Sequence, residues 1–111
     1  MSPVFIYVTC ANSDEAERIG RALVDARLAA CANILPGMSS IYRWQEQIET
    51  AQETVLIMKS TAENFEPLTA RVRAMHSYMT PCIVALPIVA GSPDFLAWLE
   101  ENTRPESTRL A

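Results

Sequence analysis

The sequence lacks any concentration of basic residues. Its eight arginines and single lysine, Lys59, are spread along 111 residues and are outnumbered by 13 acidic residues, which gives a net charge of −4. Nucleic-acid-binding domains gather Lys and Arg on one face or along one helix. The composition therefore argues against a nucleic-acid partner.

Cysteine is also scarce, and its spacing matches neither a disulfide framework nor a zinc knuckle. The three cysteines, Cys10, Cys31 and Cys82, are widely separated and form no C-x-x-C motif. An odd number leaves at least one cysteine unpaired, and structural zinc sites use closely spaced cysteine pairs. This usage is typical of proteins from a reducing compartment.

No segment predicts a signal peptide or a membrane span. The apolar residues 3–10 lack a positively charged flank and a small-residue cleavage site, so we interpret them as a strand. The longest uncharged segment, 74–93, is interrupted by His76 and by three prolines, which argues against a spanning helix. We therefore expect a cytoplasmic protein with no membrane partner.

The chain has enough apolar residues for one globular domain. Hydrophobic residues make up 50% of it and charged residues 20%, which excludes disorder. No repeat, linker or low-complexity segment divides it. We expect a single domain over residues 1–111, with 103–111 as a flexible tail.

The apolar patterns predict elements in the order β-α-β-β-α-β, followed by one more helix. Strands are expected over 3–10, 31–44, 48–60 and 82–90, and helices over 13–28, 64–76 and 93–102. This is the order of the ferredoxin-like α+β fold, which has an antiparallel sheet. In that fold Cys10, Trp44, His76 and Cys82 lie at one end of the sheet, and Cys31 lies at the other.

The two middle strands are long for this fold. Each has roughly thirteen residues, whereas five or six is usual. Their edge would carry apolar side chains such as Ile41, Tyr42 and Ile57, which invites pairing with another chain. We therefore expect a closed homo-oligomer.

Four segments of the chain carry a specific family pattern. They are LAACANILPGMSSIYRW at residues 28–44, VTCANSDEAERIGRAL at 8–23, MHSYMTPCIVALPI at 75–88 and FLAWLE at 95–100. Together they resemble the CutA family of divalent-cation-tolerance proteins. The resemblance implies a cytoplasmic, ferredoxin-like homotrimer that binds copper and other divalent ions and takes part in the response to metal ions. It implies no established reaction, so we expect no enzyme activity.

By this resemblance the metal ligands are Cys10, Met75 and His76. Thiolate, thioether and imidazole together suit copper, Cu(I) in particular, although Cu(II) stays open. Cys82 stands where the family has glutamate, and it could add a fourth soft donor. The alternative is structural: Met75 packs in the core, and His76 makes one hydrogen bond at a helix C-terminus.

A second candidate site is a cleft between subunits. The resemblance singles out Trp44, Lys59, Tyr78 and Trp98, and a lysine among aromatic side chains could hold an anionic small molecule. The alternative function is then a trimeric small-molecule sensor or scaffold resembling the nitrogen-regulatory trimers, with incidental metal binding. Cys31 lies between alanines in an apolar strand, and we expect it to be structural, not a nucleophile.

Overall fold

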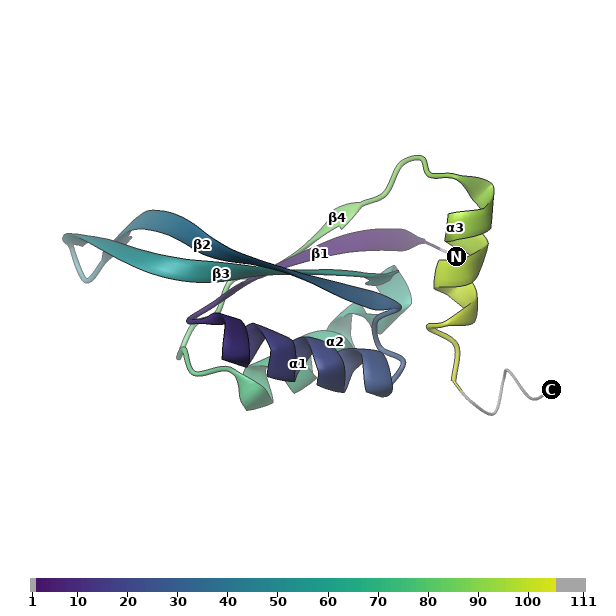
Figure 1. The fold of residues 1–111 in the computed structure, drawn as a ribbon, viewed down its shortest axis with the longest axis horizontal. Coiled ribbons are helices and arrows are strands. Elements are labelled where there is room, and N and C mark those ends of the chain that lie inside the picture. The colour runs from purple at the N-terminus through teal and green to yellow at the C-terminus, as the bar shows by residue number, and fades with distance from the viewer. Residues whose placement is uncertain (1, 106–111) are drawn as a thin grey trace.

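The computed structural model, which describes residues 2–105, pairs four strands and packs helices against them (Figure 1). The strands are β1 (Pro3–Cys10), β2 (Cys31–Trp44), β3 (Gln47–Thr61) and β4 (Ile83–Pro87). The helices are α1 (Ser13–Asp25), α2 (Phe65–Met75) and α3 (Pro93–Glu101), with a short 3₁₀ helix, Ala62–Asn64, before α2. The sheet order is β2-β3-β1-β4, and every neighbouring pair is antiparallel. The predicted ferredoxin-like α+β fold is confirmed.

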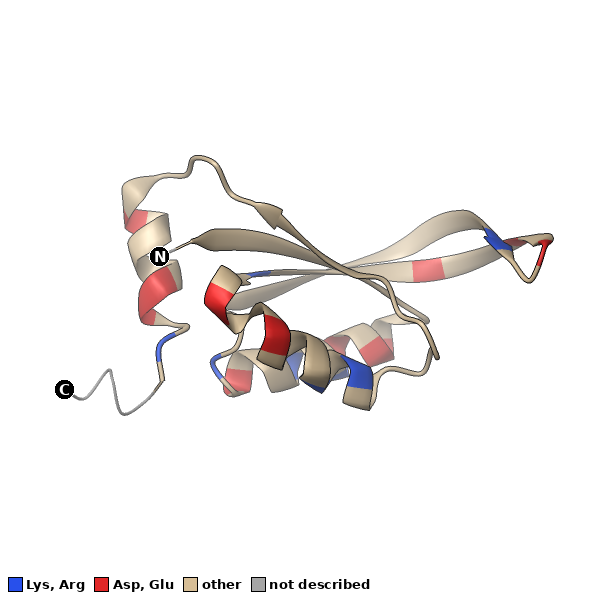
Figure 2. Ribbon diagram, turned by 180° about the vertical axis from the view of Figure 1, so that it is seen from behind, with Lys and Arg blue, Asp and Glu red and all other residues tan. Residues whose placement is uncertain are grey.

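The core lies between one face of the sheet and the helices α1 and α2, which lie side by side beneath it (Figure 1). Alternate residues of β1 point to this face: Val4, Ile6, Val8 and Cys10. The helix residues that meet them are Ala16, Ile19, Leu23, Leu68 and Val72. We call the opposite side of the sheet, which α1 and α2 do not cover, the open face. Figure 2 shows that charged residues gather on the helices and the long hairpin, while β1 and β4 carry none.

α1 begins at Ser13, the predicted first residue, and Asn12 is its N-cap. Its side-chain Oδ1 accepts a hydrogen bond from the Glu15 N–H at 2.8 Å, which satisfies one of the free amides of the first turn. The helix ends at Asp25, short of the predicted residue 28. The reason is the backbone of Arg27, whose φ of 62° is left-handed and cannot continue a right-handed helix.

Arg27 also ties the end of α1 to the C-terminal helix. Its Nε donates to the Arg104 carbonyl at 2.6 Å, and its Nη2 donates to the Glu101 carbonyl at 2.8 Å. Thr103 is buried, and its hydroxyl donates to the Leu99 carbonyl at 2.9 Å. Residues 103 and 104, expected at the start of the flexible tail, are therefore held by specific hydrogen bonds. The rest of that predicted tail, residues 106–111, lies outside the described part of the chain.

β2 and β3 form a long hairpin that projects beyond β1 (Figure 1). The register shifts between Leu35 and Met38, across Pro36 and Gly37. β1 follows β3 only as far as Cys10 opposite Thr54, so the hairpin pairs from there to the tip have no third strand. The molecule is accordingly elongated, with principal extents of 52 × 28 × 21 Å.

β4 is shorter than the predicted 82–90. It is the edge strand beside β1, and it ends at Pro87, which has no N–H to donate and is tolerated at a sheet edge. The Ile88 N–H still donates to the Pro3 carbonyl at 3.0 Å. β1 begins at Pro3, so the residues after Ile88 have no strand beside them to pair with.

Candidate metal centre and the adjoining hollow

Three side chains that can bind metal meet at one end of the sheet. The Cys10 Sγ, a Glu15 carboxylate oxygen and a His76 ring nitrogen all lie within 4.8 Å of one another. Cys10 is the last residue of β1, Glu15 lies in the first turn of α1, and His76 follows α2 directly. The fold thus brings Cys10 and His76 together, as the topology predicts, and adds Glu15. We call these three residues the polar cluster.

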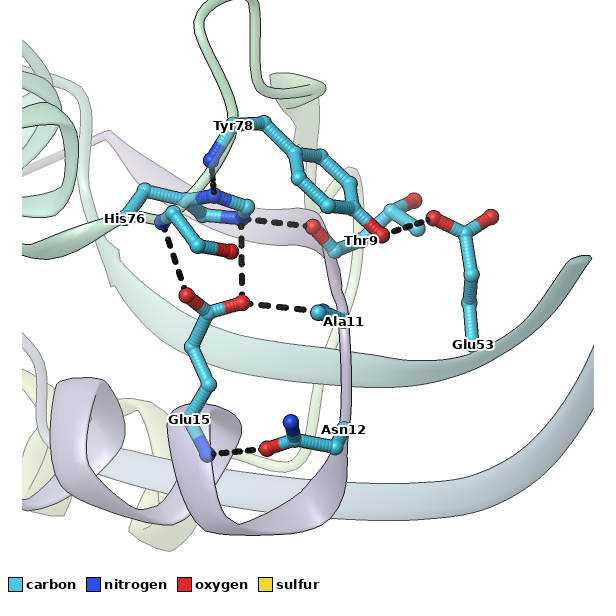
Figure 3. A network of polar contacts seen from close by, with 8 residues as sticks. Thr9, Ala11, Asn12, Glu15, Glu53, His76 and Tyr78 are labelled. Atoms are coloured by element: carbon cyan, nitrogen blue, oxygen red, sulfur yellow. Dashed lines mark hydrogen bonds and ion pairs between the residues drawn. The ribbon is translucent and has the colours of Figure 1, made fainter.

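Glu15 is not among the ligands predicted from the sequence. It is 3% exposed, and its carboxylate accepts hydrogen bonds from the Ala11 and Ser77 N–H groups, each at 2.8 Å (Figure 3). Burial alone would raise the pKa of this carboxyl. The hydrogen bonds from Ala11 and Ser77, with the nearby His76, outweigh burial and hold the pKa below its ordinary value. The available signal was the Asn12-x-x-Glu15 spacing, that of a capping box in which glutamate folds back over the helix start.

His76 uses both ring nitrogens in hydrogen bonds. Its Nδ1 lies 3.0 Å from the Tyr78 backbone nitrogen, and its Nε2 lies 2.8 Å from the Thr9 carbonyl oxygen (Figure 3). A backbone N–H can only donate, so Nδ1 is the acceptor, and Nε2 carries the hydrogen and donates to Thr9. The Glu15 carboxylate lies 3.9 Å from the same Nε2. A metal ion at His76 would therefore have to replace one of these two hydrogen bonds.

Cys10 is fully buried, and its thiol stays protonated at neutral pH. Burial, followed by the charges of Glu15 and Glu53, raises the pKa of this thiol to about 12. Thiolate is the form of cysteine that binds metal ions. A metal ion at the polar cluster would therefore displace the Cys10 proton.

A hollow of about 780 Å³ adjoins the polar cluster on the open face. Its lining includes Tyr7, Tyr42, Trp44, Glu53, Tyr78 and Cys82, and we call it the open-face hollow. Tyr78 connects it to the cluster, because its N–H meets His76 while its hydroxyl donates to the Glu53 Oε2 at 2.5 Å (Figure 3). Burial, and then the contact with Glu53, raises the pKa of the Tyr78 hydroxyl above its ordinary value.

Two of the four residues predicted for a ligand cleft line this hollow, namely Trp44 and Tyr78. Lys59 lies toward the other end of β3 and donates to the Asn33 Oδ1 at 2.8 Å. Trp98 packs on Phe95 within α3, with ring centroids 5.7 Å apart. One subunit therefore does not assemble the predicted cleft, because the length of the sheet separates Lys59 from the aromatic pair.

The sequence matches the family described as CutA1 divalent ion tolerance protein over residues 4–102. The chain belongs to the CutA family. The divalent-cation tolerance protein CutA of Thermus thermophilus is 48% identical over 98 residues, which cover 88% of this chain and 95% of that protein. The CutA of Archaeoglobus fulgidus is 46% identical, with the same coverage of 88% and 95%.

Solved CutA structures share this fold. The Thermus thermophilus protein superposes with a TM-score of 0.90 at 46% identity, covering 92% of this chain and 99% of that one. The Archaeoglobus fulgidus protein, described as periplasmic, superposes with a TM-score of 0.89 at 44% identity and the same coverage of 92% and 99%. Among residues 2–105 of the present CutA chain, no helix combines the length and apolar character that crossing a membrane requires.

Two further residues predicted near the CutA metal site lie apart from the polar cluster. The Met75 side chain packs against the core and lines a separate hollow along α1 with Arg18 and Ala22. The exposed Cys82 lines the open-face hollow, and its carbonyl accepts a hydrogen bond from the Thr9 N–H at 3.4 Å. A residue opposite Thr9 faces the same side as Thr9, away from Cys10, because successive side chains alternate across a sheet. Cys82 therefore adds no fourth donor to the cluster.

Proposed function

We propose that this protein contributes to divalent-cation tolerance by binding copper at the polar cluster. The observation that carries the proposal is the approach of Cys10, Glu15 and His76 to within 4.8 Å of one another. Thiolate and imidazole suit copper, and the proposal assigns no catalysed reaction to the chain. Its CutA relatives are named for divalent-cation tolerance, which agrees with a metal-binding role.

The donor types of the cluster fit copper, but their present hydrogen bonds have to change. Ligand atoms bonded to one such ion at about 2.0–2.3 Å lie roughly 3.5 Å apart, so the cluster would contract by about 1 Å. A metal ion at the His76 Nε2 would move the ring hydrogen to Nδ1 and so cost the contacts with both Thr9 and Tyr78, and Cys10 would lose its proton. Binding would release protons and would therefore tighten as pH rises. Met75 could join as a ligand only if its side chain left the surface of α1.

Titration of Cu(I) against a competing chromophoric chelator, in reducing and oxygen-free buffer, tests this proposal. The double variant Cys10→Ser, His76→Ala should bind at least about 100-fold more weakly. Cys31→Ser is the matched control, because it removes a thiol at the other end of the sheet, and its affinity should not change. Equal affinity in the double variant and the unaltered protein would contradict the proposal. Met75→Leu decides whether the thioether takes part.

We further propose that the protein assembles as a cytoplasmic homotrimer. Large apolar side chains are exposed on the hairpin and the open face, among them Leu35, Ile41, Ile48 and Leu86. An apolar edge of this kind favours pairing with another chain. The number three rests on the family resemblance. Sedimentation equilibrium should give three times the mass of one chain, and a monomer or dimer would contradict the assembly.

Fractionation of the source cells tests whether the protein lies in the cytoplasm.

A second candidate function is small-molecule sensing at the open-face hollow. Trp44, Tyr78 and Glu53 line a hollow of about 780 Å³, which is in the usual range for ligand sites. Thermal-shift screening tests this function, because a ligand of the native state raises the unfolding temperature. Trp44→Ala should remove the effect of such a ligand, and Trp98→Ala, on α3, should not. A screen in which every ligand acts equally on both variants would contradict it.

A further inference from the structure

Residues 77–80 follow His76 directly and lead from the end of α2 to the buried Pro81. They belong to no helix or strand, and Tyr78 is the one residue among them that is not exposed. We call this segment the strap. Because no ladder or helix fixes its backbone, its position depends on hydrogen bonds to residues outside it.

The strap is tied to the polar cluster on one side and to β3 on the other. The Ser77 N–H donates to the Glu15 Oε1 at 2.8 Å, and the Tyr78 N–H donates to the His76 Nδ1 at 3.0 Å (Figure 3). The Tyr78 hydroxyl donates to the Glu53 Oε2 at 2.5 Å. The Tyr78 ring also packs on the His76 ring, with centroids 4.8 Å apart. The strap therefore holds two of the three side chains that a metal ion would use.

A metal ion at His76 is incompatible with the hydrogen bond from the Tyr78 N–H, whichever ring nitrogen binds the ion. Neutral imidazole carries one hydrogen, which lies on Nε2 because Nδ1 accepts from Tyr78. Ligation through Nδ1 takes the lone pair that receives this hydrogen bond. Ligation through Nε2 moves the hydrogen to Nδ1, so that two N–H donors face each other across 3.0 Å. In both cases the Tyr78 N–H loses its acceptor.

The strap cannot keep its present place once this acceptor is lost. The His76 side chain is fully buried, and a donor left unpaired there costs free energy. A metal-bound imidazole normally donates its second N–H to a carbonyl, a carboxylate or water, and the Tyr78 N–H now occupies that position. Relief requires the Tyr78 backbone to leave Nδ1, which also draws on the packing of its ring against His76 and on its bond to Glu53.

We propose that the strap and copper compete for His76, so that copper binds when residues 77–80 leave the His76 ring. This inference rests on the copper site proposed above and describes the regulation of that site. The apparent affinity for copper is lower than the intrinsic affinity by the fraction of molecules whose strap is released. The coupling is reciprocal: a change that loosens the strap tightens copper binding, and bound copper loosens the strap.

Amide hydrogen exchange, measured residue by residue by NMR with and without stoichiometric Cu(I), tests the movement of the strap. A bound metal ion stabilises the native state and ordinarily slows exchange. The Tyr78 amide should instead exchange at least about tenfold faster in the copper-loaded protein, because it loses its acceptor. The His76 amide, which donates to the Val72 carbonyl at 2.9 Å, is the internal control and should not exchange faster. An unchanged or slower Tyr78 amide would overturn the proposal.

Tyr78→Phe tests the competition, because it removes the bond to Glu53 and keeps the ring on His76. It should bind Cu(I) about three- to tenfold more tightly than the unaltered protein, the equivalent of one hydrogen bond. Tyr7→Phe makes the same change on β1, where the hydroxyl contacts the Met38 Sδ at 3.4 Å, and should leave the affinity unchanged. Equal or weaker binding in Tyr78→Phe would count against the strap.

Failure of this inference and failure of the copper site give different results. If the double variant Cys10→Ser, His76→Ala binds Cu(I) as well as the unaltered protein, the copper site and the strap both fail. If the double variant loses copper but the Tyr78 amide keeps its protection in the loaded protein, only the strap fails. The exchange measurement needs no substitution, so the test does not depend on the folding of Tyr78→Phe.

Discussion

The Glu15 carboxylate accepts a hydrogen bond from the Ser77 N–H across 62 residues of chain. The same carboxylate accepts a hydrogen bond from the Ala11 N–H, between β1 and α1. One buried side chain thereby joins the connection between β1 and α1 to the segment that follows α2. Glu15 is thus a structural junction as well as a candidate ligand.

Glu15→Gln should lower the free energy of unfolding by about 1–3 kcal/mol at neutral pH, because hydrogen bonds to a charged acceptor are replaced by weaker ones. Urea denaturation measures the loss. The matched control is Glu17→Gln, whose exposed carboxylate pairs with Arg21 on the surface of α1 and should cost less than about 0.5 kcal/mol. Equal losses in the two variants would contradict the role of Glu15 as a junction.

The same carboxyl should make stability depend on pH in acid. Its pKa is lower in the folded protein than its ordinary value, so the unfolded chain binds the proton first as pH falls. The stabilisation is complete above the ordinary carboxyl pKa of about 4.3 and is lost as pH falls through the lower folded value. The unfolding free energies of the unaltered protein and Glu15→Gln should therefore converge as pH falls below the ordinary carboxyl pKa and through the lower folded value. A constant difference would refute this.

The three thiols should react in the order of their exposure. Cys82 is exposed, Cys31 is half-buried, and Cys10 is buried with a pKa of about 12. Alkylation by iodoacetamide at neutral pH, followed by mass spectrometry, should label Cys82 first and Cys10 only on unfolding, because thiolate is the reactive form. Labelling of Cys31 ahead of Cys82 would be unexpected and would revive its interpretation as a nucleophile.

Arg27→Ala should loosen the C-terminal helix. It removes the hydrogen bonds to the Glu101 and Arg104 carbonyls and should cost about 1–2 kcal/mol of unfolding free energy. Hydrogen exchange should rise in residues 93–105 more than elsewhere. Arg71→Ala, at an exposed position on α2, is the control and should leave that exchange unchanged. Unaltered exchange in Arg27→Ala would mean that α3 is held by its apolar contacts alone.

Substitutions at the tip of the hairpin should raise the stability of the protein. Gln45 and Glu46 both have positive φ, of 50° and 67°, a conformation that favours Asn and Gly in two-residue hairpin turns. The double variant Gln45→Asn, Glu46→Gly should therefore raise the free energy of unfolding by about 0.5–1 kcal/mol. Thermal unfolding measures the gain, and a lower melting temperature would be the opposite of the expected result.

The order of the elements and the meeting of Cys10 with His76 could be predicted, because apolar periodicity identifies strands and helices and the ferredoxin-like order fixes which ends coincide. The ends of the helices and strands were harder to predict from the sequence. α1 stops at Asp25 because Arg27 turns to reach carbonyls at the end of α3, far along the chain. No local pattern contains that contact.

Which residues belong to the site depends on the face of the sheet to which each side chain points. Cys82 lies beside the end of β1, as the topology predicts, but its pairing with Thr9 turns it away from Cys10. That register is set by the whole β1-β4 ladder, which spacing alone does not give.

The outer part of the hairpin lies on no third strand, and residues 41–50 are all exposed. A two-stranded ribbon alone in water is at best marginally stable. Whatever chain covers this arm therefore supplies most of its order. Dilution should then raise amide exchange in the arm before the rest of the domain responds, and the melting temperature should rise with protein concentration. For this part of the molecule, folding and association form one equilibrium.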